Sequence, residues 1–275
     1  MVRPKLLALD LDETTLDAQG RLAPENRRAL EAAIAQGIQV VVATGRAVTA
    51  LPEDVCGMPG IRYAITGNGA AVWDLAEKKA LRRYLLPPKA AEAVLRIAAG
   101  EPVAYEATVA GQPYAGWDYI RDPDKYLTDG RTADYIQRTR RGVADITAFI
   151  RQHSMELDSL NLVVDSLARK QRLMERLRQL DGVYITTSVP RLIEISNGDS
   201  GKHRGLQFLA EYLGLRRQET AAFGNADNDA EMLAWAGTGV AVQNATPGCL
   251  AAADYVTDGH DEAGVAKALK ALWGI

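Results

Sequence analysis

The chain has 275 residues, of which 47% are hydrophobic, enough to bury a sizeable core and to form two domains. Its 32 basic and 35 acidic residues give a net charge of −3, which offers no basic surface to nucleic acid. The sequence shows no signal-peptide pattern, no apolar stretch long enough to cross a bilayer and only two cysteines, without a disulfide spacing. We therefore expect a cytoplasmic protein with neither nucleic acid nor a membrane as a partner.

The first 84 residues alternate predicted strands with a predicted helix. Continuous apolar runs predict buried strands over 5–10, 39–44 and 63–66. Pro24 suits the first turn of a helix that ends at Gly37, and a hairpin is expected over 70–84. Apolar strands that alternate with helices are typical of a parallel sheet covered by helices.

From about residue 85 to residue 187 the pattern is that of a mixed α+β segment. Predicted helices and short strands follow one another at 89–99, 103–108, 160–164, 166–180 and 183–187. The segment also carries an aromatic run that includes Tyr114 and Trp117, which suits either core packing or stacking on a ring of a ligand.

The alternating pattern resumes after residue 187. Strands are predicted over 191–196, 220–224 and 239–242, and helices over 201–213, 227–236 and 261–272. Because both ends of the chain carry the same alternation, we predict an α/β fold with one discontinuous Rossmann-like core. That core comprises residues 1–84 and 188–275, and residues 85–187 form an inserted α+β domain.

Two acids, Asp10 and Asp12, follow the first predicted strand. Ligands of open α/β sheets bind beyond the carboxyl ends of the strands, and alternate residues of an extended chain point to one side. Two carboxylates this close need a cation or a shared proton, an arrangement that suits a metal-assisted nucleophile beside a general acid. A calcium loop of the EF-hand type is excluded, because Thr15 and Arg21 occupy its glycine and glutamate positions.

Two further segments suit an anion. Thr44 and Gly45 end the second strand with a hydroxyl and an approachable N–H group, although a simple Thr-capped turn explains them equally well. Lys202, His203 and Arg204 open a helix whose N-terminus is already positive. A bound anion would offset that repulsion, and the alternative is a solvated lysine on a surface turn.

A fourth polar cluster follows the strand at 220–224. Carboxylate and amide side chains gather there within five positions: Asn225, Asp227, Asn228 and Asp229. Acids are common in a first helical turn, so each alone has an ordinary structural explanation, but four together at a strand end favour a site.

Other site patterns are discounted or missing. The segment 67–72 begins like a dinucleotide fingerprint, but Val72 replaces its third small residue and a hairpin follows in place of a helix. The sequence contains no Walker A loop, no Gly-x-Ser-x-Gly motif and no His/Cys metal box.

In order and spacing, these motifs resemble those of the haloacid dehalogenase superfamily of phosphotransferases, and within it the Cof-like sugar-phosphatase branch. The matching segments are 10–16, 42–46, 66–70, 202–206, 224–233 and 264–269. The resemblance implies a Rossmann-like core with an inserted cap domain that selects the substrate.

The resemblance also implies roles for individual residues. Asp10 would be the nucleophile that becomes an aspartyl phosphate, and Asp12 the general acid and base. Mg²⁺ would be held by Asp10, the main-chain carbonyl of Asp12 and Asn225. The implied phosphate-binding residues are Leu11, Thr44, Gly45, Lys202 and Asn228. The residues expected to contact these ligands, without touching the metal or the phosphate themselves, are Thr14, Arg46, Asp227 and Asp229.

The chain departs from the family pattern at two positions. Glu13 stands where the family often has glycine. Asn225 stands where the family has the acid that binds magnesium, so it offers an oxygen without a charge. Mg²⁺ accepts neutral oxygen ligands, and Asp227 or Asp229 could supply the missing charge from nearby.

The sequence thus favours a Mg²⁺-dependent phosphomonoester hydrolase that acts on a small phosphorylated metabolite, with a sugar phosphate as the leading candidate. Three alternatives stay open: a phosphomutase or phosphotransferase of the same superfamily, a phosphometabolite-binding protein with weakened catalysis, and, more distantly, a Rossmann-type oxidoreductase. The reason to consider a binding protein with weakened catalysis is Asn225, which stands in place of a charged metal ligand. The sequence carries no signal for an oligomeric state.

Overall fold

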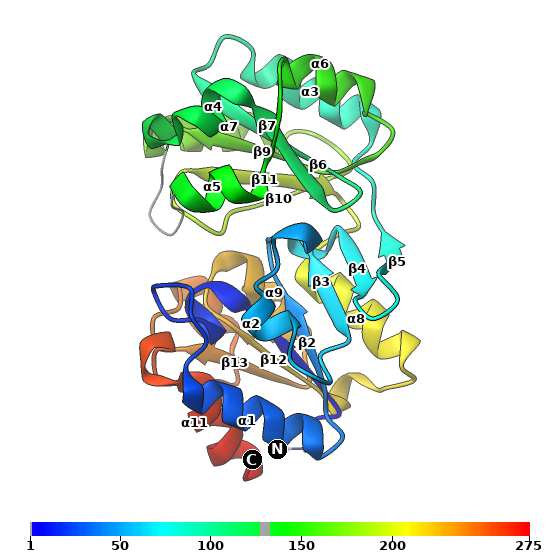
Figure 1. Cartoon of the computed structure of the whole chain (residues 1–275), viewed down its shortest axis with the longest axis vertical. Coiled ribbons are helices and arrows are strands. Elements are labelled where there is room, and N and C mark those ends of the chain that lie inside the picture. Colours follow the sequence, from blue (N-terminus) through cyan, green and yellow to red (C-terminus); the bar gives the residue numbers. More distant parts are fainter. Residues whose placement is uncertain (1, 127–132) are drawn as a thin grey trace. The chain divides into compact units, whose positions relative to one another are not determined.

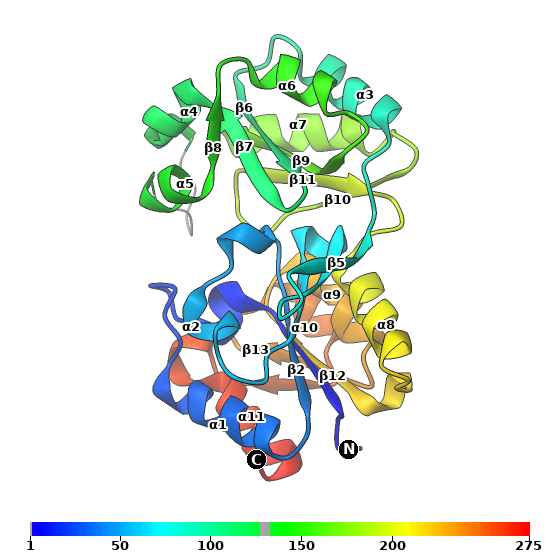
Figure 2. The same ribbon diagram turned by 45° about the vertical axis from the view of Figure 1, so that its right-hand side comes forward.

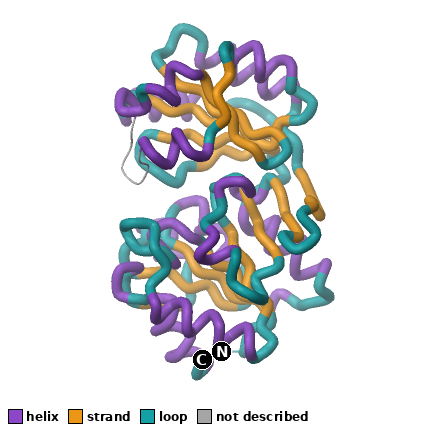
Figure 3. The backbone as a smooth tube through the Cα atoms, in the orientation of Figure 1, coloured by secondary structure: helices purple, strands orange, loops and turns teal. Residues whose placement is uncertain are grey.

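The computed structural model describes residues 2–126 and 133–275, and these form two compact units. The first unit comprises the described parts of 1–46, 51–82 and 201–275, and the second comprises those of 47–50 and 83–200 (Figure 1). In each unit the strands form a sheet with helices packed on it (Figure 3). No helix among the described residues is long and apolar enough to span a membrane.

The first unit is built on an eight-stranded sheet with the strand order β14-β13-β12-β1-β2-β3-β4-β5. Its strands are β1 (Leu6–Leu9), β2 (Gln39–Ala43), β3 (Tyr63–Thr66), β4 (Ala71–Asp74), β5 (Lys79–Arg83), β12 (Thr220–Gly224), β13 (Thr238–Val242) and β14 (Tyr255–Thr257). The strands from β14 to β3 are parallel, and β4 returns antiparallel to β3. Strand β1 lies between β12 and β2, so the segment that follows it starts at the middle of the sheet.

Helices cover both faces of this sheet (Figures 1 and 2). The helices on one face are α1 (Pro24–Ala35), α2 (Glu53–Cys56) and α11 (Gly264–Trp273). Those on the other face are α8 (Lys202–Tyr212), α9 (Asp227–Trp235) and α10 (Pro247–Ala252).

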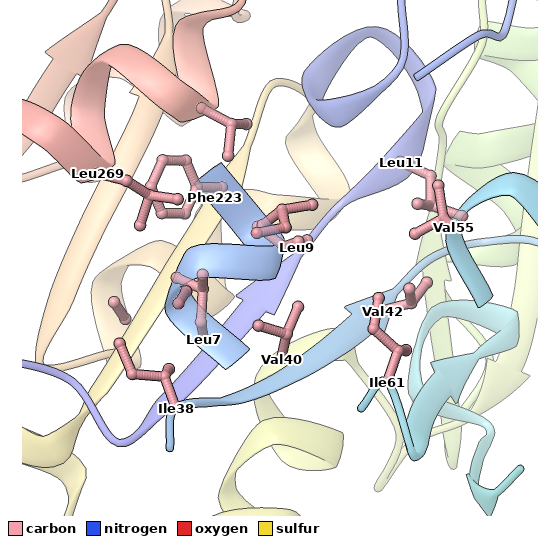
Figure 4. Close-up of a cluster of buried hydrophobic side chains, with 14 of the residues drawn as sticks. Leu7, Leu9, Leu11, Ile38, Val40, Val42, Val55, Ile61, Phe223 and Leu269 are labelled. Atoms are coloured by element: carbon pink, nitrogen blue, oxygen red, sulfur yellow. The ribbon is translucent and has the colours of Figure 1, made fainter. Parts of the chain in front are cut away.

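Burial on both faces explains why the central strands of the first unit, such as β1 and β2, read as apolar runs. Leu7 and Leu9 of β1 pack towards α1 and α11, with Phe223 and Leu269 in the same cluster (Figure 4). Leu6 and Ala8 of the same strand pack on the opposite face. All four β1 residues are fully buried, so each position requires an apolar side chain.

The second unit has a six-stranded sheet with the order β10-β11-β9-β6-β7-β8. Its strands are β6 (Val103–Val109), β7 (Gln112–Gly116), β8 (Arg141–Val143), β9 (Leu157–Val164), β10 (Val183–Thr186) and β11 (Leu192–Asn197). Every pair in it is antiparallel except β7 with β8. Helices α3 (Pro88–Ala98), α6 (Ile146–Gln152) and α7 (Leu167–Leu177) pack on one face, and α4 (Trp117–Arg121) and α5 (Ala133–Thr139) pack on the other.

One predicted strand belongs to a different sheet from the one expected. The sequence places 191–196 in the parallel core, but β11 pairs antiparallel with β9 and β10 in the second unit. The expected start of the returning core at residue 188 is therefore wrong, and the first unit resumes at Gly201. The reason is that a short apolar strand looks alike in both kinds of sheet. Strand β11 is buried on both faces, as a parallel strand is, and Ile193, Glu194 and Ile195 are all buried.

The predicted fold class is confirmed: a parallel, helix-covered α/β core is interrupted by a mixed α+β unit. The alternation in the first 84 residues and after residue 200 corresponds to the strands and long helices of the first unit.

Candidate active site

Hydrogen bonds from the core hold the segment that follows β1 in place. The Asp10 backbone N–H donates to the Phe223 carbonyl at 3.0 Å, and the Thr15 hydroxyl donates to the Asp10 carbonyl at 2.6 Å. Asn26, fully buried in α1, donates to the Thr15 carbonyl at 3.0 Å and accepts the Ala266 N–H at 3.0 Å. Buried hydrogen bonds from two helices therefore hold the backbone on which Asp10 sits.

The tight turn 11–15 explains why the family often has glycine where this chain has Glu13. Leu16 N–H closes the turn by donating to the Leu11 carbonyl at 2.9 Å, and Glu13 has a φ of +56°. A left-handed φ favours glycine, so the family's usual glycine suits this backbone better than glutamate. The Leu11 side chain is fully buried in the core, so only its backbone could contact a phosphate.

Lys202 joins two carboxylates at the edge of the sheet. Its Nζ lies 2.7 Å from Asp10 Oδ1 and 2.6 Å from Asp229 Oδ1. The other Asp229 oxygen accepts the backbone N–H groups of Asn225 and Ala226, both at 3.1 Å. The three charged side chains are almost completely buried, so the end of β1, the first turn of α8 and the first turn of α9 form one cluster.

Burial sets the electrostatics of this cluster. Burial and the neighbouring Asp229 carboxylate raise the pKa of Asp10 to about 7, although Lys202 opposes the shift. Burial also disfavours the Lys202 ammonium, but Asp10 and Asp229 outweigh it and raise the pKa of Lys202. Two buried carboxylates with one ammonium leave a negative charge that a proton or a cation can compensate.

The side-chain oxygens near Asp10 suit a hard divalent cation. The Thr14 hydroxyl donates to Asn225 Oδ1 at 3.1 Å, and that carbonyl oxygen has a second lone pair. The described residues hold no group of three or more His, Cys, Asp or Glu side chains placed to bind a metal ion. A metal here would thus use neutral oxygens beside Asp10, and Mg²⁺ accepts such a set of carboxylate, amide and backbone carbonyl.

Asp12 is held by Arg46. Arg46 Nε lies 2.9 Å from one Asp12 oxygen, and Arg46 Nη2 lies 2.5 Å from the other. The Asp12 side chain is 53% exposed, unlike that of Asp10. The sequence placed both residues near the site but did not reveal this bidentate pair, because the two residues lie on different strand ends.

The second strand end adds Thr44 and Gly45. Thr44 is buried, and its hydroxyl accepts the Arg46 N–H at 3.1 Å, while its backbone N–H donates to the Ile65 carbonyl at 2.9 Å. Gly45 is half-buried beside it. The hydroxyl thus lies in the turn that also carries Arg46.

The polar side chains in the first turn of α9 contact different partners. Asn228 Nδ2 donates to Asn68 Oδ1 at 2.9 Å, and both side chains are buried. Asp227 instead accepts the Thr246 hydroxyl at 2.7 Å and takes no part in the Lys202 cluster. Of the two acids considered as a source of charge near Asn225, Asp229 is the one that contacts Lys202.

Asn68 is the site residue that the sequence reasoning missed. It lies in the segment 66–70, which matches the family motifs, but the resemblance assigns no role to Asn68. A usable signal was present, because Gly67-Asn68-Gly69 follows the third parallel strand at the same sheet edge as the other motifs.

Comparison with known proteins agrees with this architecture. The model of the haloacid dehalogenase-like hydrolase family matches residues 7–269. The chain is 31% identical to the phosphatase YwpJ of Bacillus subtilis, over 98% of this chain and 99% of the relative. It is 28% identical to the 5-amino-6-(5-phospho-D-ribitylamino)uracil phosphatase YcsE of the same organism, over 97% and 94%. A solved haloacid dehalogenase-like hydrolase from B. subtilis superposes with a TM-score of 0.83 at 26% identity, over 98% of this chain and 99% of that one.

The family match covers nearly the whole chain, and the relatives extend over both units. The chain therefore belongs to the haloacid dehalogenase superfamily, in its Cof-like branch, and is a phosphatase.

Proposed function

We propose that this phosphatase is a Mg²⁺-dependent phosphomonoester hydrolase that works through an aspartyl phosphate at Asp10. The observation that carries the proposal is the buried ion pair between Asp10 and Lys202 at the end of the central strand β1. An acid at this position is fixed, shielded from water and adjacent to a cation that can hold a phosphoryl oxygen.

In the first step, an Asp10 oxygen forms a bond to phosphorus while the bond between phosphorus and the leaving oxygen breaks. Asp12 gives a proton to that oxygen, which leaves as an alcohol. Asp12 is paired with Arg46 in the structure, so this role requires the pair to open. In the second step, water attacks the aspartyl phosphate, Asp12 takes its proton, and Asp10 and inorganic phosphate are released.

The remaining residues bind and orient. Lys202, Thr44, the Gly45 N–H, the Leu11 backbone and Asn228 are proposed to hold the phosphoryl oxygens. Mg²⁺ would be held by Asp10, the Asp12 carbonyl and Asn225, and when bound it lowers the repulsion between the carboxylate and the phosphate. Thr14 orients Asn225, and Asp229 orients Lys202.

For the substrate, we propose a small phosphorylated metabolite, with sugar phosphates first. The support is the relative YcsE, which is named for a phosphoribityl compound. We also propose that the first unit carries the chemistry and the second, mixed α+β unit is the cap that selects the substrate. The second unit would then determine which leaving groups the enzyme accepts.

The test is turnover of 4-nitrophenyl phosphate with and without Mg²⁺. Asp10→Asn removes the nucleophile, and we expect no measurable turnover. Asp17→Asn is the matched control, since this carboxylate lies in the same segment but contacts Gln19 and Arg21. Retained activity of Asp10→Asn would exclude the nucleophile assignment. Release of free phosphate without an added alcohol would separate a hydrolase from a phosphotransferase.

A further inference from the structure

Asn68 occupies an unusual backbone position beside the site. It is the middle residue of the loop Gly67–Gly69 between β3 and β4, with a φ of +54° and a side chain that is only 3% exposed. Asparagine is among the residues that tolerate this left-handed conformation best, although glycine adopts it at less cost. A buried, polar, non-glycine residue at such a position needs an explanation from its contacts.

The contacts of Asn68 connect two parts of the proposed phosphate site. Its backbone N–H donates to the Thr44 carbonyl at 3.1 Å. Its side-chain Oδ1 accepts Asn228 Nδ2 at 2.9 Å, across 160 positions of sequence. The end of β2 and the first turn of α9 are thus bridged by one side chain and its own backbone.

The loop that carries Asn68 is itself fixed. Gly67 N–H donates to the Arg46 carbonyl at 3.0 Å. Gly69, with a φ of +87°, lies so close to the start of α8 that an added Cβ would come within 2.1 Å of the Gly201 carbonyl oxygen. Asn68 is therefore seated between the turn of Thr44 and the helix that begins with Lys202.

Asn228 depends on this contact for its orientation. Within the part of the chain that the structure describes, its Oδ1 is buried and accepts no hydrogen bond, so the bond to Asn68 is what fixes the amide. Because a carbonyl oxygen can only accept, Asn68 selects the NH₂ end of the Asn228 amide. The NH₂ group has two N–H donors, and the bond to Asn68 uses one of them.

We propose that Asn68 is a positioning residue for phosphate: it orients Asn228 so that the second N–H donates to a phosphoryl oxygen. The inference rests on the proposed function, which assigns Asn228 to phosphate. It adds a residue that acts through another one and does not itself touch the phosphate.

The experiment measures binding of inorganic phosphate to the full-length protein in Mg²⁺ by isothermal titration calorimetry. Asn68→Gly removes the side-chain amide, and glycine adopts the left-handed backbone readily. We therefore expect the variant to fold, and thermal unfolding checks this. We expect phosphate binding to weaken about tenfold, the size of one lost hydrogen bond to an anion. With 4-nitrophenyl phosphate, we expect KM to rise more than kcat falls.

A double-mutant cycle separates positioning from a direct contact. In an Asn228→Ala background, Asn68→Gly should cause no further loss, because the residue through which Asn68 acts is already absent. Lys78→Gly is the matched control, since Lys78 is also a left-handed non-glycine residue, with a φ of +50°, but is exposed in the turn between β4 and β5. This control should bind phosphate like the wild type.

The outcomes are distinguishable. Unchanged phosphate affinity in Asn68→Gly, or equal losses in the wild-type and Asn228→Ala backgrounds, would overturn the positioning role. If the wild-type protein neither binds phosphate nor hydrolyses the ester, the proposed function fails and the inference with it.

Discussion

Removing the charge of Asp10 should stabilise the metal-free protein while abolishing turnover. Asp10 is buried beside Asp229, and its pKa is raised to about 7. A carboxyl whose pKa is higher in the folded than in the unfolded state binds more protons when folded, so stability falls as pH rises through that window. Asp10→Asn removes this loss, because an amide of the same shape does not titrate.

The magnitude follows from the pKa values. Between pH 5 and the folded pKa of about 7, each pH unit costs about 1.4 kcal/mol, and above pH 7 the loss is complete. The difference in unfolding free energy between Asp10→Asn and wild type should therefore grow by about 3 kcal/mol from pH 5 to pH 8. Added Mg²⁺ should stabilise the wild type more than the variant, because the proposed metal site uses the Asp10 carboxylate.

The assay is urea denaturation in a chelator at pH 5, 6, 7 and 8, followed by tryptophan fluorescence. Three of the four tryptophans, Trp73, Trp235 and Trp273, lie in the first unit, so the signal reports mainly on that unit. Asp17→Asn is the control: despite some burial, hydrogen bonds from Arg21 and Gln19 lower its pKa, so it is ionised throughout this range. A difference between Asp10→Asn and wild type that stays constant from pH 5 to 8 would refute the reasoning.

Three further predictions concern the same cluster. Asn225→Asp should tighten Mg²⁺ binding about tenfold or more by adding a charged ligand, and an unchanged calorimetric titration would place Asn225 outside the metal site. Mg²⁺ binding to the wild type should weaken about tenfold per pH unit below pH 7, since the Asp10 proton must leave, and titrations that agree at pH 6 and pH 8 would contradict this. Lys202→Met should destabilise the protein by about 3–5 kcal/mol in urea denaturation, because two buried carboxylates lose their cation. The double variant Lys202→Met/Asp229→Asn should lose less stability than Lys202→Met alone. An equal loss of stability in the two variants would show that packing, not charge, holds Lys202 in place.

Much of the first unit was predictable because its local patterns are strong. Strands buried on both faces, such as β1, must be apolar throughout, and α1 carries both a proline near its start and a glycine after its end. The strand β11 was assigned to the wrong sheet because a short strand that is buried on both faces has the same apolar character in a parallel and in an antiparallel sheet. The short helices α4, α5 and α6 span two turns or less, too little for a periodic pattern to show.

The candidate site was predictable as a set of strand ends but not as a set of contacts. Motif order pointed to Asp10 and Asn225, which follow parallel strands whose carboxyl ends meet at one edge, and to Lys202, which begins helix α8. The sequence could not show that Lys202 lies between two carboxylates, since side-chain direction depends on packing. Asn68 was missed for the same reason: its role comes from a residue 160 positions away.

The order of the strands has a consequence for synthesis on the ribosome. Strand β1 emerges well before its neighbour β12, which begins at Thr220, so one edge of β1 has no partner until β12 has been made. An apolar strand with an open edge is prone to pair with other chains. The segment 83–200, by contrast, emerges without interruption and holds the complete second sheet. We expect chains truncated at residue 210 and released from the ribosome to resist protease in that segment and to be cleaved readily before it, and uniform resistance would disprove this order.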